Sequence, residues 1–136
     1  MPTQKRQFGD QGEEIAVNFL KAKGYKILDK NYRQPWGEID IVAAKTKGFL
    51  GRKTEAIFFV EVKTIKGQGG ELASALAGGN VHYKKQQRLI RAAKTYLAQK
   101  RILPEIPWQI DVIIVNLNTE TKLAKIEHLA NAVWGK

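Results

Sequence analysis

Glu38-Ile-Asp-Ile-Val-Ala-Ala44 reads as a β-strand, and Ala56-Ile-Phe-Phe-Val-Glu-Val-Lys63 reads as a second one. Both are apolar enough to be central strands of a sheet, yet each carries charged residues. Side chains alternate between the two faces of a strand, so Glu61 and Lys63 are expected to share one side. Burying an unpaired charge on a central strand costs folding free energy, so another group must balance the negative charge of Glu61.

Asp40 on the first strand and Glu61 on the second place two carboxylates on neighbouring segments. A divalent cation held between them would compensate their charge, and hard cations such as Mg²⁺ choose carboxylate oxygens. The Lys63 amine could then orient or deprotonate a water, or stabilise negative charge on a phosphate. The alternative is a buried ion-pair network of Glu61, Lys63 and Asp40 without a metal.

The chain has 136 residues, which predicts a single domain over 1–136. It lacks cysteine, so disulfides, thiolate zinc sites and cysteine nucleophiles are excluded. His82 and His128 lie in different segments without metal-ligand spacing, so any metal is expected to be oxygen-bound. No run of about 18 apolar residues and no signal-like start is present, so we expect a soluble, cytoplasmic protein without a membrane partner.

The net charge is strongly positive: 23 Lys and Arg stand against 13 Asp and Glu, a balance of +10. An excess of this size favours a polyanionic partner such as nucleic acid. A basic protein without a specific partner is the alternative.

The order of expected elements is helix, strands, helix, strands. A helix is predicted over 8–23, strands over 25–28, 38–44 and 56–63, a helix over 82–101, and strands over 108–116 and 123–129. The chain is expected to turn at 35–37, and a long connector at 45–55 is expected to join the strands 38–44 and 56–63 as an antiparallel pair. The glycine-rich segment 64–80, with a helix-capable piece at 71–77, is expected to be a mobile loop. The second helix can cross over and return the strand at 108–116 parallel to its neighbour, which predicts an α/β sandwich with helices on both faces of a mixed sheet.

Two adjacent glutamates of the first helix are not equivalent. Glu13 falls among apolar residues on the helical wheel, whereas Glu14 belongs to a solvated stripe. Gly12 directly before them permits the close approach of another segment. Glu13 either faces a site or merely stabilises the N-terminus of the helix through its dipole, and the wheel alone leaves both interpretations open.

A set of short motifs resembles the YraN-type family of small uncharacterised bacterial proteins. The motifs are Gly12-Glu13-x-x-Ala16, Gly24-Tyr25, Asn31-x-Arg33, Gly37-Glu-Ile-Asp40, Phe59-Val-Glu61-Val-Lys63, Lys85 with Leu89 and Ala93, Asp111-Val, and His128-x-x-Asn-Ala. That family in turn resembles the restriction-endonuclease-like PD-(D/E)xK nucleases and, among them, the archaeal Holliday junction resolvases. The resemblance implies a restriction-endonuclease-like α/β sandwich in which a mixed β-sheet is flanked by helices.

The resemblance also implies roles for individual residues. Glu13, Asp40 and Glu61 would be catalytic metal ligands for Mg²⁺ or Mn²⁺, the Val62 carbonyl a further ligand, and Lys63 the catalytic lysine.

Three departures from the superfamily pattern stand out. Ile39 replaces the usual proline before the aspartate, Ile65 replaces a basic residue after the E-x-K, and the connector at 45–55 is long. The first is shared by this branch. The second would weaken phosphate contacts, and the third would supply a DNA-contacting flap or nothing.

The helix expected at 82–101 carries seven Lys or Arg and no acid. An electropositive ridge is predicted on it, formed by Lys84, Lys85, Arg88, Arg91 and Lys94. Such a ridge fits phosphate binding, although a solvated face without a ligand is the ordinary alternative.

Three more residues, Lys85, Trp36 and Asp111, lie near these segments. Lys85, at the edge of the ridge, could turn back toward the acidic site as an auxiliary phosphate contact. Trp36 is expected to close the edge of the core, with stacking on a base as the alternative. Asp111 is expected to pair with an arginine.

The function expected from these patterns is Mg²⁺-dependent hydrolysis of DNA phosphodiester bonds, with branched DNA as one candidate substrate. The alternatives are a catalytically silent nucleic-acid-binding module of the same fold and a basic RNA-associated accessory protein. A homodimer is an open alternative for the assembly.

Overall fold

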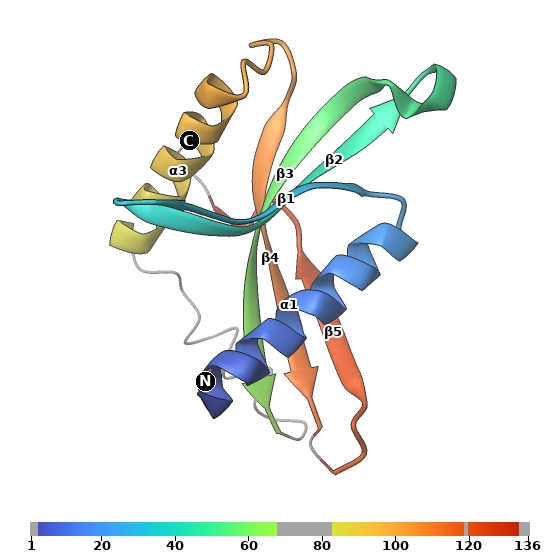
Figure 1. Ribbon diagram of the computed structural model, residues 1–136, viewed down its shortest axis with the longest axis vertical. Coiled ribbons are helices and arrows are strands. Elements are labelled where there is room, and N and C mark those ends of the chain that lie inside the picture. The colour runs from blue at the N-terminus through green and yellow to red at the C-terminus, as the bar shows by residue number, and fades with distance from the viewer. Residues whose placement is uncertain (1–2, 68–82, 119, 134–136) are drawn as a thin grey trace.

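Two α-helices and a five-stranded sheet make up the described part of the chain, residues 3–67, 83–118 and 120–133 of the computed structural model (Figure 1). The elements in chain order are α1 (Gln4–Ala22), β1 (Lys26–Gln34), β2 (Gly37–Lys47), the 3₁₀ turn η1 (Phe49–Gly51), β3 (Lys53–Lys66), α3 (Tyr83–Gln99), β4 (Trp108–Leu117) and β5 (Ala124–Leu129).

The sheet is mixed, with the strand order β1-β2-β3-β4-β5. The first three strands form an antiparallel meander, β4 lies parallel to β3, and β5 returns antiparallel to β4. The connection from β3 to β4 contains α3, as expected for a parallel crossover. The predicted α/β architecture is therefore confirmed, as are the antiparallel pairing of β2 with β3 and the parallel pairing of β3 with β4.

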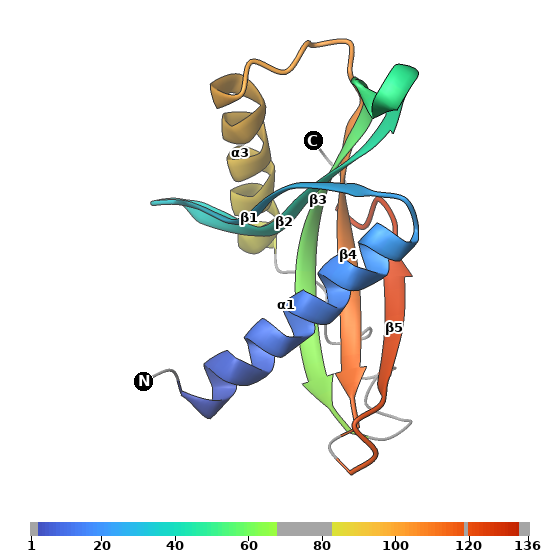
Figure 2. The ribbon, with the colours of Figure 1, turned by 45° about the vertical axis from the view of Figure 1, so that its right-hand side comes forward.

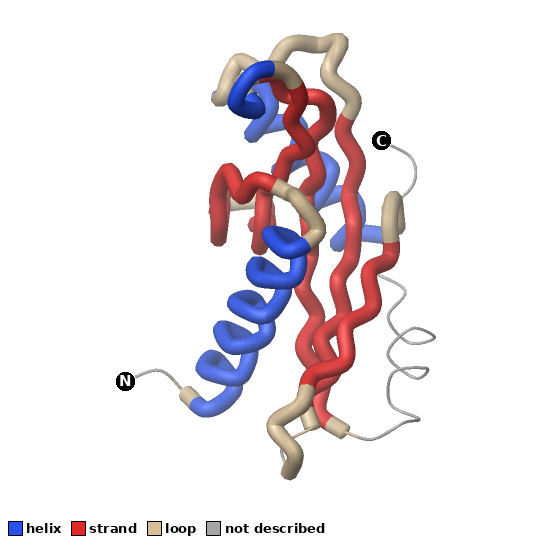
Figure 3. Tube along the Cα trace, turned by 90° about the vertical axis from the view of Figure 1, so that its right-hand side faces the viewer, coloured by secondary structure: helices blue, strands red, loops and turns tan. Residues whose placement is uncertain are grey.

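The two helices cover opposite faces of the sheet. Tyr96 of α3 packs in one buried cluster with Phe59, whereas Leu20 of α1 packs in a second cluster with Val60. Phe59 and Val60 are neighbours on β3, so they point to opposite faces. In Figure 2, α1 crosses in front of β3 and β4, while β1 and β2 pass in front of α3. The side view in Figure 3 shows α1 lying alongside the strands.

β2 and β3 separate at the point where their acidic residues lie. Their pairing ends at Ile41 and Val60; beyond it β2 continues along β1 and β3 continues along β4. Asp40 and Glu61 are the first residues past the last pair. The separation frees backbone groups on both strands and opens the sheet between the two carboxylates.

Several elements are longer than the sequence pattern predicted. α1 begins at Gln4, where the Thr3 hydroxyl accepts the N–H of Arg6 at 3.1 Å and caps the helix. The connector expected at 45–55 is a shorter turn, because β2 and β3 extend to Lys47 and Lys53. Residues 64–66 are part of β3 rather than of a loop, while the remainder of the expected loop and its helix-capable piece, 68–80, lie outside the described residues.

Within the described ranges, neither α1 nor α3 has the length and apolarity to cross a membrane.

Candidate active site

Asp40 lies at the separated end of β2, with its carboxylate directed to β3. Its Oδ2 accepts the backbone N–H of Val62 at 2.7 Å. This N–H would pair with β2 if the two strands stayed together, so the carboxylate replaces a bond of the sheet. The hydrogen bond fixes the side chain beside the Glu61-Val62-Lys63 segment, as the sequence pattern predicted.

Glu13 of α1 joins the same site. Its side chain hydrogen bonds with the side chains of Asp40 and Asn31, whereas neighbouring Glu14 is exposed. The helix begins nine residues earlier, at Gln4, so Glu13 is far from the helix N-terminus and the dipole interpretation is wrong.

The close approach expected at Gly12 is present. A Cβ at this position would lie 1.9 Å from the Thr64 Oγ1 of β3. A helix can cross this strand only where it carries no side chain, and the crossing sets the next residue, Glu13, over the separated strands.

Glu61 is paired by a lysine from α3. The Nζ of Lys85 lies 2.9 Å from Glu61 Oε1, and the Glu61 side chain is only 16% exposed. Lys63 is exposed and takes part in none of the ion pairs that join described residues. The alternative interpretation, a Glu61–Lys63–Asp40 ion-pair network, is therefore wrong in its lysine, because Lys85 of the crossover helix supplies the counter-charge of Glu61. The expectation that Lys85 turns back toward the acidic site is confirmed.

Burial changes the acidity of the three carboxyl groups. It raises the pKa of Asp40 to about 6; the Val62 N–H opposes this shift, and the charge of Glu13 adds to it. Burial likewise raises the pKa of Glu61 to about 7, with a further increase from the charge of Asp40 and a decrease from Lys85. The pKa of Glu13 is also raised, mainly by burial.

The pKa of Lys85 is also raised. Burial lowers the pKa of Lys85, but the hydrogen bond to Glu61 and the charges of Glu61 and Asp40 raise it by more. The lysine therefore stays charged at neutral pH, next to an acidic pair that holds protons more readily than free carboxylates do.

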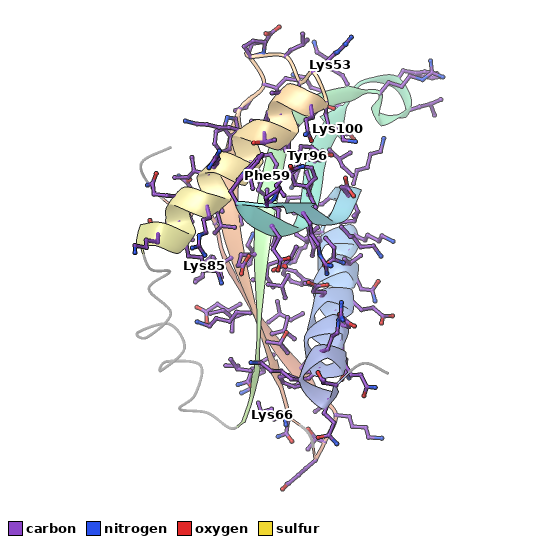
Figure 4. The ribbon with its side chains drawn as sticks, turned by 60° about the vertical axis from the view of Figure 1, so that its left-hand side comes forward. Lys53, Phe59, Lys66, Lys85, Tyr96 and Lys100 are labelled. Carbon is purple, nitrogen blue, oxygen red and sulfur yellow. The ribbon has the colours of Figure 1, made fainter. Side chains whose placement is uncertain are left out.

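An open cavity of about 500 Å³ contains the acidic residues. It is lined by the carboxylates of Glu13, Glu38, Asp40 and Glu61, by Val62, and by two lysines, Lys5 and Lys66. Figure 4 shows Lys66 at the far end of β3 and Lys85 at the start of α3. The carboxylates of this cavity attract a cation, and the ammonium groups of Lys5 and Lys66 attract an anion. The cavity therefore suits a ligand with both charges, such as a metal ion bound to a phosphate.

The donor set fits a hard cation in its chemistry. The three carboxylates come from three elements and destabilise one another when ionised, which a divalent cation would relieve. In the described ranges, no three acidic or histidine side chains are placed so that they could hold one metal ion in their present conformations. The Oε1 of Glu61 faces the Lys85 amine, so a cation at this carboxylate would compete with Lys85.

The basic ridge predicted on α3 is present as an exposed surface. The predicted members, Lys84, Lys85, Arg88, Arg91 and Lys94, are all exposed. The opposite side of the helix buries Leu89, Ile90, Ala93 and Tyr96, and Leu97 packs against that cluster. The helical-wheel assignment of the two faces is thus confirmed, and the role of the exposed face in phosphate binding stays a prediction.

Trp36, next to the acidic strand, is partly buried at the turn between β1 and β2. The Arg91 guanidinium lies over its ring, 4.4 Å from the centroid. Trp36 therefore contacts the basic helix, which neither sequence interpretation anticipated.

Asp111 has a different partner from the expected arginine. It is fully buried, and its Oδ2 lies 2.7 Å from His128 Nε2. Its Oδ1 accepts the Asn131 N–H at 2.8 Å and the Gln109 side-chain amide at 2.7 Å. This network ties the end of β5 to β4 and lines none of the cavities at the acidic site. The arginine prediction was wrong because the partner is supplied by the next strand.

The fold brings three further residues to the site, Asn31, Lys5 and Lys66, for which the sequence pattern predicted no role. Asn31 has a left-handed backbone, with φ of 53°, and its side chain reaches Glu13. Its signal was present in the Asn31-x-Arg33 motif. Lys5 and Lys66 had no signal, since their positions depend on the length of α1 and of β3.

Comparison with known proteins gives a consistent result. The profile described as uncharacterised protein family UPF0102 matches residues 12–115. A UPF0102 protein of Alkaliphilus oremlandii is 39% identical over 128 residues, which cover 93% of this chain and 97% of the relative. A UPF0102 protein of Desulforamulus reducens is 33% identical over 133 residues, covering 98% and 100%.

Proposed function

The chain belongs to the uncharacterised protein family UPF0102, and we propose that it is a Mg²⁺-dependent endonuclease that hydrolyses phosphodiester bonds of DNA. Membership of this family confirms the YraN-type resemblance of the sequence motifs. The names of the relatives assign no activity, so the proposal stands on the geometry of the site.

One observation carries the proposal: acidic side chains from α1, β2 and β3 meet where β2 and β3 separate. Asp40 is fixed by the Val62 N–H, and Glu13 and Glu61 both interact with it. The stability of the fold does not require three partly buried acids at one point, because their burial raises the pKa of each. A binding role for a divalent cation accounts for the cluster.

The residues divide the work as follows. Asp40, Glu61 and Glu13 hold the cation, with the Val62 carbonyl as a further oxygen donor. A bound Mg²⁺ lowers the pKa of its water and neutralises charge on the phosphate. Lys63, two residues after Glu61 on the same strand, positions the attacking water in line with phosphorus. Lys85, which pairs with Glu61, would be free to contact the phosphate if a cation took its place at Glu61.

The test is cleavage of labelled DNA by the full chain with Mg²⁺ or Mn²⁺, compared with EDTA. Single-stranded, duplex, flap and four-way-junction substrates rank the preferred DNA form. Asp40→Asn and Lys63→Ala, purified identically, are expected to fold and to lose cleavage by a factor of about 100 or more. The absence of metal-dependent cutting on every substrate would overturn the proposal, as would equal cutting by Asp40→Asn.

A binding module without turnover is the second candidate, and the Lys85–Glu61 ion pair favours it. The amine already neutralises Glu61, so a metal is not needed to balance this carboxylate. This candidate expects DNA binding that falls with salt and does not respond to Mg²⁺. A thermal-shift titration separates the two: Mg²⁺ raises the Tm of the wild type but not of Asp40→Asn under the nuclease proposal, and changes neither protein under the alternative.

A further inference from the structure

A groove of about 680 Å³ lies between the β1–β2 turn and the exposed side of α3. It is lined by residues 34–38 at the turn and by Gln87, Arg88 and Arg91 of α3. The volume is in the range of small-molecule sites and is large enough for a nucleotide. None of the roles assigned above to the acidic cavity uses this groove.

The two walls of the groove are in direct contact. A Cβ at Gly37 would lie 3.0 Å from the backbone carbonyl oxygen of Arg88, so a larger residue there would crowd the contact between the turn and α3. On the same side, the Arg91 guanidinium covers the ring of Trp36 at 4.4 Å. The Trp36 Nε1 is buried without a hydrogen-bond partner among the described residues. The groove thus combines an aromatic ring, a guanidinium stacked on it and an unmet donor.

The groove adjoins the acidic cavity. Glu38 lines both of them, and its side chain is drawn toward Arg33, whose Nε lies 3.5 Å from Glu38 Oε2. Along α3, Arg88 follows one turn after Lys85, the residue that reaches Glu61. A DNA strand that places one phosphate at the acidic cavity would therefore have cationic side chains of α3 near its neighbouring phosphates, in the direction of the groove.

We propose that this groove holds an unpaired nucleotide of the DNA strand, next to the phosphate at the acidic cavity. The inference rests on the proposed function and narrows its substrate to DNA in which a duplex adjoins a single-stranded arm. Arg88 and Arg91 bind the phosphates, and the base stacks on the platform formed by Arg91 and Trp36.

The chemistry of the groove favours an unpaired nucleotide over other polyanions. A base inside a duplex is already stacked on its neighbours and cannot place its face on a side chain without leaving the stack. An acidic peptide would use the arginines but has no flat surface for the guanidinium and indole planes. Unpaired bases, in contrast, stack favourably on aromatic and guanidinium planes.

The test measures binding rather than cleavage, so it can fail independently of the proposed function. The Kd of the full-length Asp40→Asn protein in EDTA is measured for a blunt duplex, for the same duplex with a single-stranded arm, and for a free deoxynucleoside monophosphate. We expect about tenfold tighter binding of the armed duplex than of the blunt one. Equal affinity for the two duplexes would overturn the inference, and so would a free mononucleotide that binds as tightly as the armed duplex.

Three substitutions in the same background assign the preference to the groove. Arg91→Gln is expected to reduce the armed-to-blunt ratio to about twofold or less, and Arg91→Lys to reduce it while keeping most affinity for the blunt duplex, because an ammonium lacks the stacking plane. Arg52→Gln removes the same charge on the β2–β3 hairpin, outside the groove, and is expected to keep the ratio. An unchanged ratio in both Arg91 variants would contradict the inference.

Tryptophan fluorescence tests whether the unpaired base lies next to Trp36. Replacing Trp108 and Trp134 by Phe leaves Trp36 as the only tryptophan. Its fluorescence is expected to be quenched by the armed duplex and not by the blunt one. Identical spectra with both substrates would show that the unpaired base lies elsewhere. Quenching together with a complete lack of Mg²⁺-dependent cleavage would retain the nucleotide site and reject the nuclease proposal.

Discussion

Lys85 of α3 and Glu61 of β3 form an ion pair of 2.9 Å across the crossover connection. The Glu61 side chain is 16% exposed and the Lys85 side chain 56% exposed, so a solvated amine reaches a nearly buried acid. The pair shows how the fold compensates the charge of a carboxylate on a central strand. It also makes Lys85 a competitor of any cation for Glu61.

The first prediction concerns this pair. Lys85→Gln is expected to lower the free energy of unfolding by about 1 kcal/mol at pH 8.5, because the ionised Glu61 then loses its counter-charge. The pKa of Glu61 is about 7, so at pH 5 this carboxyl is protonated and the same substitution is expected to cost much less. Urea unfolding at both pH values in EDTA measures the difference. Lys84→Gln, on the exposed side of the same turn, is the control, and an equal loss at both pH values for Lys85→Gln would contradict this account.

The second prediction concerns Asp40. Its pKa is raised from 3.8 to about 6 in the folded protein, so ionisation costs folding free energy as the pH rises from about 4 to 6, and the full cost persists above this window. Asp40→Asn still offers an oxygen to the Val62 N–H but never ionises. It is expected to be more stable than the wild type by about 1–3 kcal/mol at pH 8 in EDTA, and equally stable at pH 3.5.

The measurement for Asp40 is the free energy of unfolding against pH for both proteins. A variant that is less stable than the wild type at pH 8 would indicate that the carboxylate serves folding rather than a site. Together with the expected loss of cleavage, a gain in stability would show that the fold tolerates Asp40 at a cost in stability.

The third prediction uses two glycines of α1. Gly12→Ala is expected to destabilise the protein by about 1–3 kcal/mol, because its Cβ would overlap the Thr64 side chain at 1.9 Å. Gly9→Ala is the matched control: no atom lies within 4 Å of its Cβ, so the better helix propensity of alanine should stabilise by up to about 1 kcal/mol. Thermal unfolding of both variants measures this, and opposite signs are expected. Thr64→Ala combined with Gly12→Ala should recover part of the loss.

The fourth prediction separates the Asp111 network from the site. Asp111→Ala leaves His128, the Asn131 N–H and the Gln109 amide without their acceptor, and is expected to cost about 3 kcal/mol or more. Asp111→Asn retains an acceptor and should cost less. At a temperature where each variant is folded, metal-dependent cleavage by both should match the wild type, because Asp111 lines neither acidic cavity. Loss of cleavage in a folded variant would place this network in the site.

Much of the fold was predictable from local patterns. The apolar runs with period-two side chains fixed β2, β3 and β4, and the helical wheel separated Glu13 from Glu14 and the buried from the exposed side of α3. Element ends were less predictable. The Thr3 cap lengthens α1, and cross-strand pairing extends β2 and β3 into the connector, where the local sequence alone is neutral.

The residues of the site were likewise predictable in part. Strand alternation and spacing alone indicated Asp40 and Glu61 as a carboxylate pair, since both depend only on neighbours in the chain. The ion-pair partner of Glu61 and the partner of Asp111 required tertiary structure: strand order and the crossover bring Lys85 and His128 to these carboxylates from 24 and 17 residues away.

The sequence by itself therefore determined which segments are strands and helices, the excess of positive charge and the acids that interrupt apolar strands, because these are properties of composition and short-range periodicity. Only the tertiary structure decided where β2 and β3 separate, which lysine neutralises Glu61, and that Trp36 and Arg91 stack beside a groove. Those relationships depend on the packing of elements distant in the chain, which local side-chain preferences do not encode.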